Sequence, residues 1–140
     1  MRKVIVIFVL NFMCLFTLQA QEAGSTIVVN VSEISSNKGK IIVGLYANSD
    51  DFLKHIIDGK RVEINNKSCS VSFKNIPEGT YAISLFHDEN NDGKMDTNFM
   101  GIPTEDYGCS NDARDFMGPP EWEDAKFELK EKIMIHHIKL

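Results

Sequence analysis

Short runs of alternating apolar and polar residues recur along most of this chain, and they constrain its fold more than any other feature. In residues 25–33, Ile27, Val29 and Val31 fall on one side of an extended segment, and polar residues fall mostly on the other. Such alternation is typical of a strand with one buried face. Similar runs occupy residues 40–47, 61–64, 69–74, 80–87, 124–130 and 132–140. Turn-forming residues separate the runs, so the sequence predicts an all-β fold, a single antiparallel β-sandwich of about seven strands.

Two connections have patterns of their own. Residues 49–58 have apolar side chains at helical spacing, with acidic residues at the start and Gly59 just after the end. This pattern predicts one short helix that covers an end of the core. The last two strands are separated by Lys130 and Glu131, which predicts a tight hairpin turn between them.

Residues 88–123 show no strand or helix period. The segment is longer than the roughly 12–15 residues usual for a structureless connection in a compact domain. Its aromatic residues and prolines argue against disorder, which favours polar, flexible compositions. We therefore expect a long ordered loop.

The N-terminal segment is typical of a secretory signal peptide. Arg2 and Lys3 precede a short apolar run over residues 4–18, and Ala20 precedes a polar stretch. The run is short for a membrane span, and cleavage after Ala20 is favoured over retention as an anchor. The sequence thus predicts a signal peptide (residues 1–20) and one β-sandwich domain (residues 21–140). The mature chain would be periplasmic or secreted, with no membrane span.

The predicted mature chain is acidic. The full sequence has 15 basic and 20 acidic residues, and removing Arg2 and Lys3 leaves 13 basic residues and a formal charge of −7. Nucleic acid and anionic lipid are polyanions, so this charge disfavours both as partners. It is compatible with cations.

The most distinctive motif lies in residues 88–96. Side chains with oxygen atoms recur at every second position, Asp88, Asn90 and Asp92, and Gly93 follows. In a calcium-binding loop, oxygens at positions one, three, five and nine surround the ion, and a glycine makes the sharp turn at position six. We therefore predict a calcium site. Its expected ligands are the side chains of Asp88, Asn90, Asp92 and Asp96 and the backbone carbonyl of Lys94.

An alternative to the calcium site stays open. Phe99 stands at position twelve, where an EF-hand loop has a bidentate Glu. An ion would need a further oxygen, for which the candidates are Glu105, Asp106 and Asp112. Asn91, Asp92 and Gly93 are also favoured hairpin-turn residues, and Asx side chains stabilise turns through their own hydrogen bonds. On that interpretation the segment is an acidic hairpin turn.

Four other residues are candidates for structural or ligand roles. Cys69 and Cys109 form a disulfide in one hypothesis and are two separate small hydrophobic residues in the other. Arg114 is either an organiser of the loop through ion pairs or an anion clamp. Trp122 either pins the returning loop to the sandwich or provides a stacking platform for a sugar.

Catalysis has few candidate residues. His136 and His137 are adjacent in a predicted strand, so they point to opposite faces and cannot both bind one ion there. No Gly-x-Ser-x-Gly motif is present, and Cys109 has no base beside it in sequence. The alternative to a binding module is a secreted hydrolase that uses His87 and neighbouring carboxylates as general acid and base.

The ordered motifs resemble a known family. They are residues 86–98 (FHDENNDGKMDTN), Gly101-Ile102-Pro103, Tyr107-Gly108, Ser110-Asn111-Asp112-Ala113-Arg114, Gly118-Pro119-Pro120 and Asp124-Ala125-Lys126-Phe127. Over nearly the whole mature chain these resemble the exported bacterial proteins grouped as domain of unknown function family 2141. Cys109 stands where that family usually has an aromatic residue, so a disulfide there would be a local feature.

The resemblance implies a fold and a compartment but no activity. Residues 75–81 are also similar to the turn and strand of transthyretin-like and surface-adhesin domains, which implies an immunoglobulin- or transthyretin-like sandwich. We expect a non-catalytic module with a calcium-binding loop, acting in binding or structural support at the cell envelope. Its expected partner is another envelope protein or a glycan.

Overall fold

The computed structural model describes residues 24–115 and 118–140. The predicted signal peptide, residues 1–20, lies outside the described residues. So does Phe116 of the long loop. Among the described residues, no helix has both the length and the apolar character needed to cross a bilayer.

The described chain is built almost entirely from strands and loops. The strands are β1 (Ser25–Ser32), β2 (Lys40–Tyr46), β3 (Asp58–Glu63), β4 (Cys69–Ile76), β5 (Gly79–Asp88), β6 (Tyr107–Cys109), β7 (Phe127–Leu129) and β8 (Ile133–Lys139). A 3₁₀ turn, η1 (Ser110–Asp112), lies within the predicted long loop, and one short helix, α2 (Trp122–Ala125), spans the end of that loop and the start of the predicted strand over residues 124–130. The all-β prediction is confirmed.

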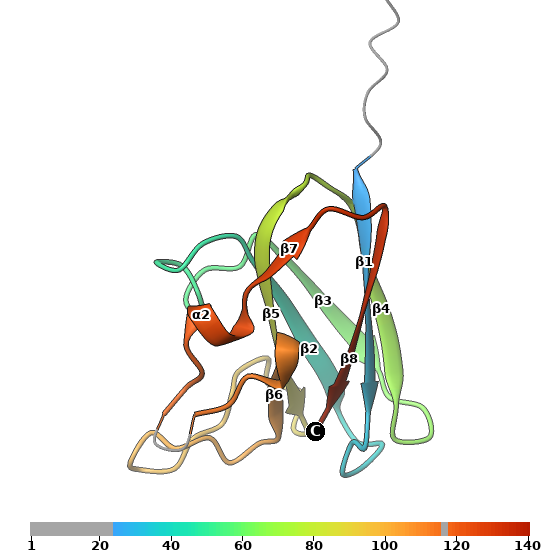
Figure 1. The fold of residues 1–140 in the computed structure, drawn as a ribbon. Coiled ribbons are helices and arrows are strands. Elements are labelled where there is room, and N and C mark those ends of the chain that lie inside the picture. Colours follow the sequence, from blue (N-terminus) through green and yellow to red (C-terminus); the bar gives the residue numbers. More distant parts are fainter. Residues whose placement is uncertain (1–23, 116–117) are drawn as a thin grey trace, which may run out of the picture.

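The strands form two sheets that face each other (Figure 1). One sheet has the order β4-β1-β8, and the other has the order β3-β2-β5-β6. β7 pairs with the first residues of β5, Gly79 to Tyr81, and β6 pairs with residues 84–86 of the same strand. All pairs are antiparallel except β1 and β8, which run parallel from Thr26 opposite Ile133 to Ser32 opposite Lys139. The predicted β7–β8 hairpin is wrong: β7 pairs with β5, and the chain then crosses to the other sheet.

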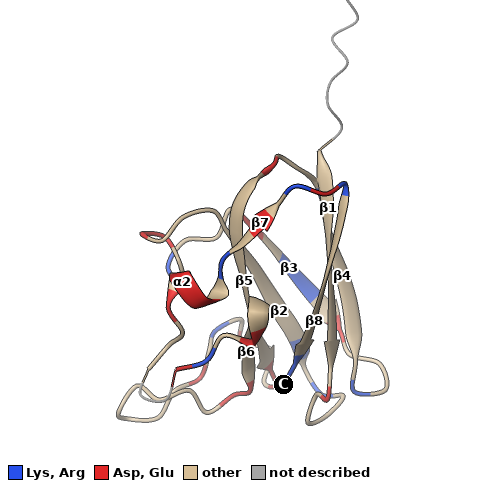
Figure 2. Ribbon diagram, in the orientation of Figure 1, with Lys and Arg blue, Asp and Glu red and all other residues tan. Residues whose placement is uncertain are grey.

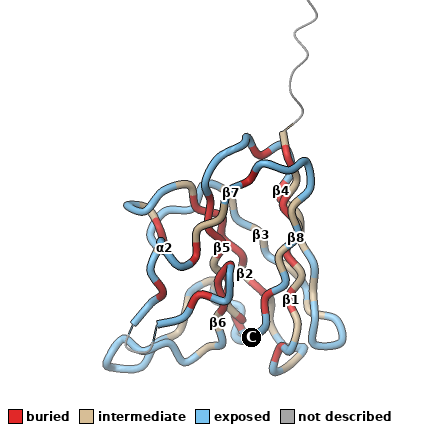
Figure 3. Tube along the Cα trace, viewed as in Figure 1, coloured by how far each residue is buried: buried red, intermediate tan, exposed pale blue. Residues whose placement is uncertain are grey.

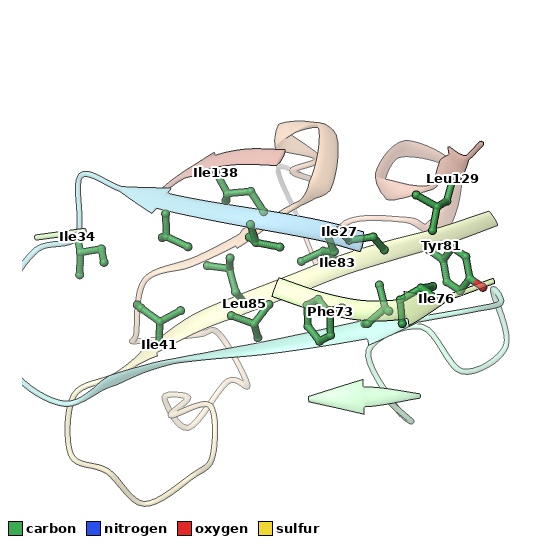
Figure 4. Packing of buried hydrophobic residues seen from close by; sticks show 14 residues of the cluster. Ile27, Ile34, Ile41, Phe73, Ile76, Tyr81, Ile83, Leu85, Leu129 and Ile138 are labelled. Atoms are coloured by element: carbon green, nitrogen blue, oxygen red, sulfur yellow. The ribbon is translucent and has the colours of Figure 1, made fainter. Parts of the chain in front are cut away.

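The sandwich core fills the space between the sheets, as Figure 4 shows. The alternation in the sequence has the expected result. Ile27, Val29 and Val31 of β1 are buried, while the residues between them are partly exposed. On β5, Ile83 and Leu85 are fully buried. Burial of such side chains contributes about 1.5–3 kcal/mol each, which makes this core the main source of stability.

A second, smaller cluster covers the outer face of the β2–β5 sheet. Tyr46 of β2 and Ala82 of β5 face away from the sandwich core and are buried there. Phe52 packs edge-on against Tyr46 and against Trp122, with ring centroids 5.3 Å and 5.7 Å apart. The β2–β5 pair is therefore covered on both faces at Tyr46 and Ala82, and the long loop supplies much of the outer cover (Figure 3).

The predicted helix over residues 49–58 is wrong. The segment is a series of turns, Leu53 has a φ of 60°, and β3 already begins at Asp58. One of the apolar residues in this segment, Ile56, instead packs against the β2–β3 pair. Gly44 and Gly59 lie opposite each other in the β2–β3 pair, and a side chain at either would meet Ile56 at 2.7 Å. Ile56 thus fits a notch that two glycines create.

Two polar side chains, Ser110 and Asn111, hold the returning loop against β5 and α2. The buried hydroxyl of Ser110 accepts a hydrogen bond from the Ile83 N–H at 2.9 Å and donates one to the Ala125 carbonyl at 2.5 Å. The amide of Asn111, whose φ is 60°, donates to the carbonyls of Asp124 and Lys126. These bonds join β5, η1 and α2 into one unit.

We expect Ser110→Ala to lower the free energy of unfolding by about 1–3 kcal/mol. The substitution leaves a buried N–H and a buried carbonyl without their partner. Denaturant unfolding of the purified protein measures the change. The matched control is Ser70→Ala, which removes an exposed bond to the Asn30 side chain and should change stability by no more than about 0.5 kcal/mol. Equal losses of unfolding free energy in the two variants would contradict a stabilising role of the buried Ser110 hydroxyl.

Candidate functional site

The acidic loop begins at the buried end of β5. Asp88 is the last residue of that strand, lies opposite Lys40 of β2 and is 2% exposed. Its two carboxylate oxygens accept hydrogen bonds from the N–H groups of Asp92, at 3.2 Å, and Gly93, at 2.9 Å. Gly93 has a φ of +80°, a conformation that favours glycine. The turn is therefore closed around a carboxylate that β5 holds in place.

The other predicted ligands are drawn into the same turn. Asn90 Oδ1 accepts from the Asp92 N–H at 3.0 Å, and Asp92 Oδ1 accepts from the Lys94 N–H at 2.8 Å. Asn90 Nδ2 donates to Asp96 Oδ2 at 2.8 Å. The structure thus brings Asp88, Asn90, Asp92, Lys94 and Asp96 together. Their contacts are Asx hydrogen bonds, as the hairpin-turn alternative describes.

Glu105 joins the two ends of this loop. Its carboxylate accepts from the Glu89 N–H at 3.1 Å and from the Asp96 N–H at 3.0 Å. An open pocket of about 310 Å³ lies here, lined by Glu89, Asn90, Asp96, Thr104, Glu105 and Asp106. Of the three candidates for a further oxygen, Glu105 and Asp106 line this pocket. Asp112 lies in η1 and does not line the pocket.

Negative charge is concentrated around this loop, where Figure 2 shows several acidic segments before β6. Residues 88–106 have six acidic residues and one lysine, a formal charge of −5, and the rest of the 140-residue chain has 14 acidic and 14 basic residues. Among the described residues, Asp88, Asp92, Asp96, Glu105 and Asp106 form no ion pair with Lys or Arg.

The oxygen donors fit the chemistry of calcium, which binds carboxylate, amide and carbonyl oxygens. They do not form a closed cage. In the part of the chain that the structure describes, no three side chains of His, Cys, Asp or Glu are grouped so as to hold a metal ion. The physical reason is that the loop oxygens are directed at N–H groups of the same turn.

His87 is buried near the end of β5 and contacts other groups of the protein. It is 0% exposed, its Nε2 lies 2.7 Å from the Lys38 carbonyl, and its Nδ1 lies 3.2 Å from the Ser35 hydroxyl. Glu89 Oε1 is 3.6 Å from the same Nδ1. The Ser35 hydroxyl and the Glu89 carboxylate therefore both lie near Nδ1 of His87. In a catalytic triad the acid contacts one ring nitrogen of the histidine and the hydroxyl contacts the other.

The other two strand histidines lie on opposite faces of β8, as expected. His136 faces inward, with its ring centroid 4.2 Å from that of Phe127. Burial lowers the pKa of His136, and the neighbouring His137 lowers it further. Its Nε2 is buried without a hydrogen-bond partner among the described residues. His137 is exposed.

Trp122 makes the contact that its structural interpretation requires, whereas Arg114, among the described residues, contacts a backbone carbonyl and not the carboxylates of the predicted ion pairs. Arg114 Nη2 donates to the Lys139 carbonyl at 3.2 Å and so ties the loop to β8. Trp122 is half-buried, and its edge-on contact with Phe52 pins α2 to the outer face of the sheet.

Sequence analysis did not predict the finger, which we define as residues 96–105. Its two legs pair through the Thr97–Pro103 bridge and through the Thr104 N–H bond to the Asp96 carbonyl. Asn98 closes the tip: its Oδ1 accepts from the N–H groups of Met100 and Ile102. Gly101 has a φ of +78°. The sequence signal for this turn was Asn98 three residues before Gly101. It lies in a segment that has no strand or helix period.

Cys69 and Cys109 are free thiols in this structure, so the disulfide of one hypothesis is not formed in it. Cys69 packs against the sandwich core, whereas Cys109 belongs to the cluster on the outer face of the β2–β5 sheet. That sheet therefore lies between the two sulfur atoms. Bond formation would require backbone movement.

We expect two slowly reacting free thiols in protein that lacks residues 1–20. Burial raises the pKa of both Cys69 and Cys109, so the reactive thiolate forms only above the usual pH range. A thiol-reactive dye at about pH 8 should label the half-buried Cys69 first, and Cys109 only on unfolding. Release of two thiols by reductant, with none available after unfolding without reductant, would contradict this arrangement.

The comparisons with known proteins agree with the resemblance seen in the sequence. No curated protein and no solved structure matches this chain. The model of the family described as "Uncharacterized protein conserved in bacteria (DUF2141)" matches residues 29–136, which run from the first strand to the last. The chain belongs to this bacterial family.

Proposed function

We propose that this protein is an exported, non-catalytic β-sandwich module whose acidic loop binds calcium, and that it acts in binding or structural support at the cell envelope. The expected partner is another envelope protein or a glycan. The periplasmic or secreted location follows from the proposed signal peptide over residues 1–20.

One observation carries the calcium part of the proposal: several carboxylates gather at one loop and, among the described residues, form no ion pair with Lys or Arg, although the Arg61 guanidinium lies beside Gly93. Asp88 is buried, Asp92 and Asp96 share its turn, and Glu105 and Asp106 line the adjoining pocket. Like charges at short distance repel one another, and a bound divalent cation removes that repulsion. The rigid end of β5 holds the first of these carboxylates.

The proposed ligands are the side chains of Asp88, Asn90, Asp92 and Asp96 and the carbonyl of Lys94. Glu105 is the best-placed source of a further oxygen, because its carboxylate already reaches both ends of the loop. Binding would compete with the Asn90–Asp96 hydrogen bond and require a local rearrangement. We therefore expect a modest affinity, with a Kd on the order of 10⁻⁴–10⁻³ M, as in extracellular modules.

The hydrolase alternative has less support. A general base must reach the proton that it removes, and both ring nitrogens of the buried His87 already face groups of the protein itself.

Calcium should raise the thermal stability of the protein. At a free calcium concentration about ten times the Kd, linkage adds roughly 1.4 kcal/mol to the free energy of unfolding. Melts with calcium and with chelator measure the shift. Asp92→Asn should abolish most of it, because the amide keeps an oxygen for the Lys94 N–H but loses the charge.

The matched control for this series is Asp50→Asn, an exposed acidic residue outside the loop. It should leave the calcium-dependent shift intact. Asp92→Ala tests the same site with the turn hydrogen bond also removed. A wild-type melting temperature that does not respond to millimolar calcium would reduce the loop to an acidic hairpin turn.

Export can be tested separately from calcium. Intact-mass spectrometry of the protein from its native host should give a chain that begins at Gln21, because the proposed cleavage follows Ala20. Recovery of the chain with residues 1–20 attached would contradict the proposed processing.

A further inference from the structure

The finger presents apolar side chains to solvent at a fixed position. Phe99 is 97% exposed, Met100 is 64% exposed and Ile102 is 51% exposed. Isolated exposed apolar residues are normal on protein surfaces, but contiguous ones mark interaction sites. These three lie within four consecutive residues of one hairpin tip.

The tip is held by hydrogen bonds and not by packing of its apolar residues. The Asn98 N–H donates to the Ile102 carbonyl, and the Gly101 N–H donates to the Asn98 carbonyl, each at 2.9 Å. With the two bonds to Asn98 Oδ1, four hydrogen bonds fix a three-residue turn. A preformed tip loses less conformational entropy on binding than a flexible loop.

The charge around the tip indicates what it can dock against. The legs of the finger end at Asp96 and Glu105, and Asp106 follows directly. The surrounding segment, residues 88–106, has the −5 charge described above. A surface that contacts the apolar tip therefore also meets carboxylates, and it is favoured if it is basic.

We propose that the finger docks into a protein partner whose apolar pocket is rimmed by Lys or Arg, with Phe99 as the anchor. Aromatic side chains and Met are enriched at the centres of interfaces, and a fully desolvated aromatic often carries much of the binding energy. The inference deepens the binding role proposed above, but it does not depend on calcium.

A lipid surface fits the same tip less well. Anionic headgroups would be brought close to residues 88–106, where the charges repel them. The lipid outcome is nevertheless distinguishable by experiment, because neutral and anionic vesicles respond differently to this charge.

The test measures fluorescence anisotropy of two labelled amphipathic peptides with the purified protein. One peptide is built from leucine and lysine, and the other from leucine and glutamate. The leucine–lysine peptide should bind wild type in a salt-sensitive manner. Phe99→Ser should weaken that binding roughly tenfold or more, since it removes a buried aromatic contact. The leucine–glutamate peptide should not bind.

The matched control is Ile57→Ser, which removes a 52% exposed apolar residue far from the acidic segment in sequence and should leave binding unchanged. Phe99→Ser should not alter the melting temperature, because its side chain is almost wholly exposed. Equal peptide binding by wild type and Phe99→Ser would overturn the proposal. So would binding to phosphatidylcholine or phosphatidylglycerol vesicles that Phe99→Ser abolishes, which would make the tip a lipid anchor.

The same measurements in chelator and in millimolar calcium separate this inference from the calcium proposal. Loss of binding in Phe99→Ser under both conditions supports docking even if calcium has no effect on stability. A calcium-dependent melting shift that survives in Phe99→Ser, without any effect of that substitution on peptide binding, supports calcium binding and overturns docking.

Discussion

The burial of β5 on both faces is the constraint on which the rest of this structure depends. Ile83 and Leu85 face the sandwich core, and Ala82 faces the outer cluster, all with no exposed surface. Along its edges the strand pairs with β2 on one side and with β6 and β7 on the other. A strand enclosed in this way cannot shift register without exposing apolar side chains. Asp88, at its end, therefore has a fixed position from which the acidic loop starts.

The buried faces of the strands could be predicted from the sequence, because the alternation of apolar and polar residues reflects which side of the sheet each residue faces. The alternation of Ile27, Val29 and Val31 predicted a buried face because each strand residue experiences one side of the sheet. It could not predict that β8 joins β1 in parallel, because the partner of a strand is decided by non-local packing. The same holds for residues 49–58. Their helical spacing was real, but the notch at Gly44 and Gly59 accommodates Ile56 in a turn.

The loop illustrates a second limit of sequence reasoning. The motif of residues 88–96 predicted which side chains gather, and they do gather in one turn. The aromatic residues and prolines of residues 88–123 predicted an ordered loop. Hydrogen bonds within the chain provide that order: Ser110 bonds to β5, Asn111 bonds to the backbone around α2, and Asn98 closes the finger. An ion in the acidic loop would therefore act mainly by compensating charge, since hydrogen bonds already define the path of the chain.

Charge compensation would in turn connect the two proposed sites. One calcium ion changes the formal charge of residues 88–106 from −5 to −3, and this segment includes the whole finger. Attraction to a basic partner weakens when that charge falls, and by thermodynamic linkage a docked basic partner weakens calcium binding by the same factor. Calcium would strengthen partner binding only if ordering the base of the finger contributed more to the binding free energy than the reduced attraction costs. The sign of the coupling thus distinguishes an electrostatic role of the ion from a structural one.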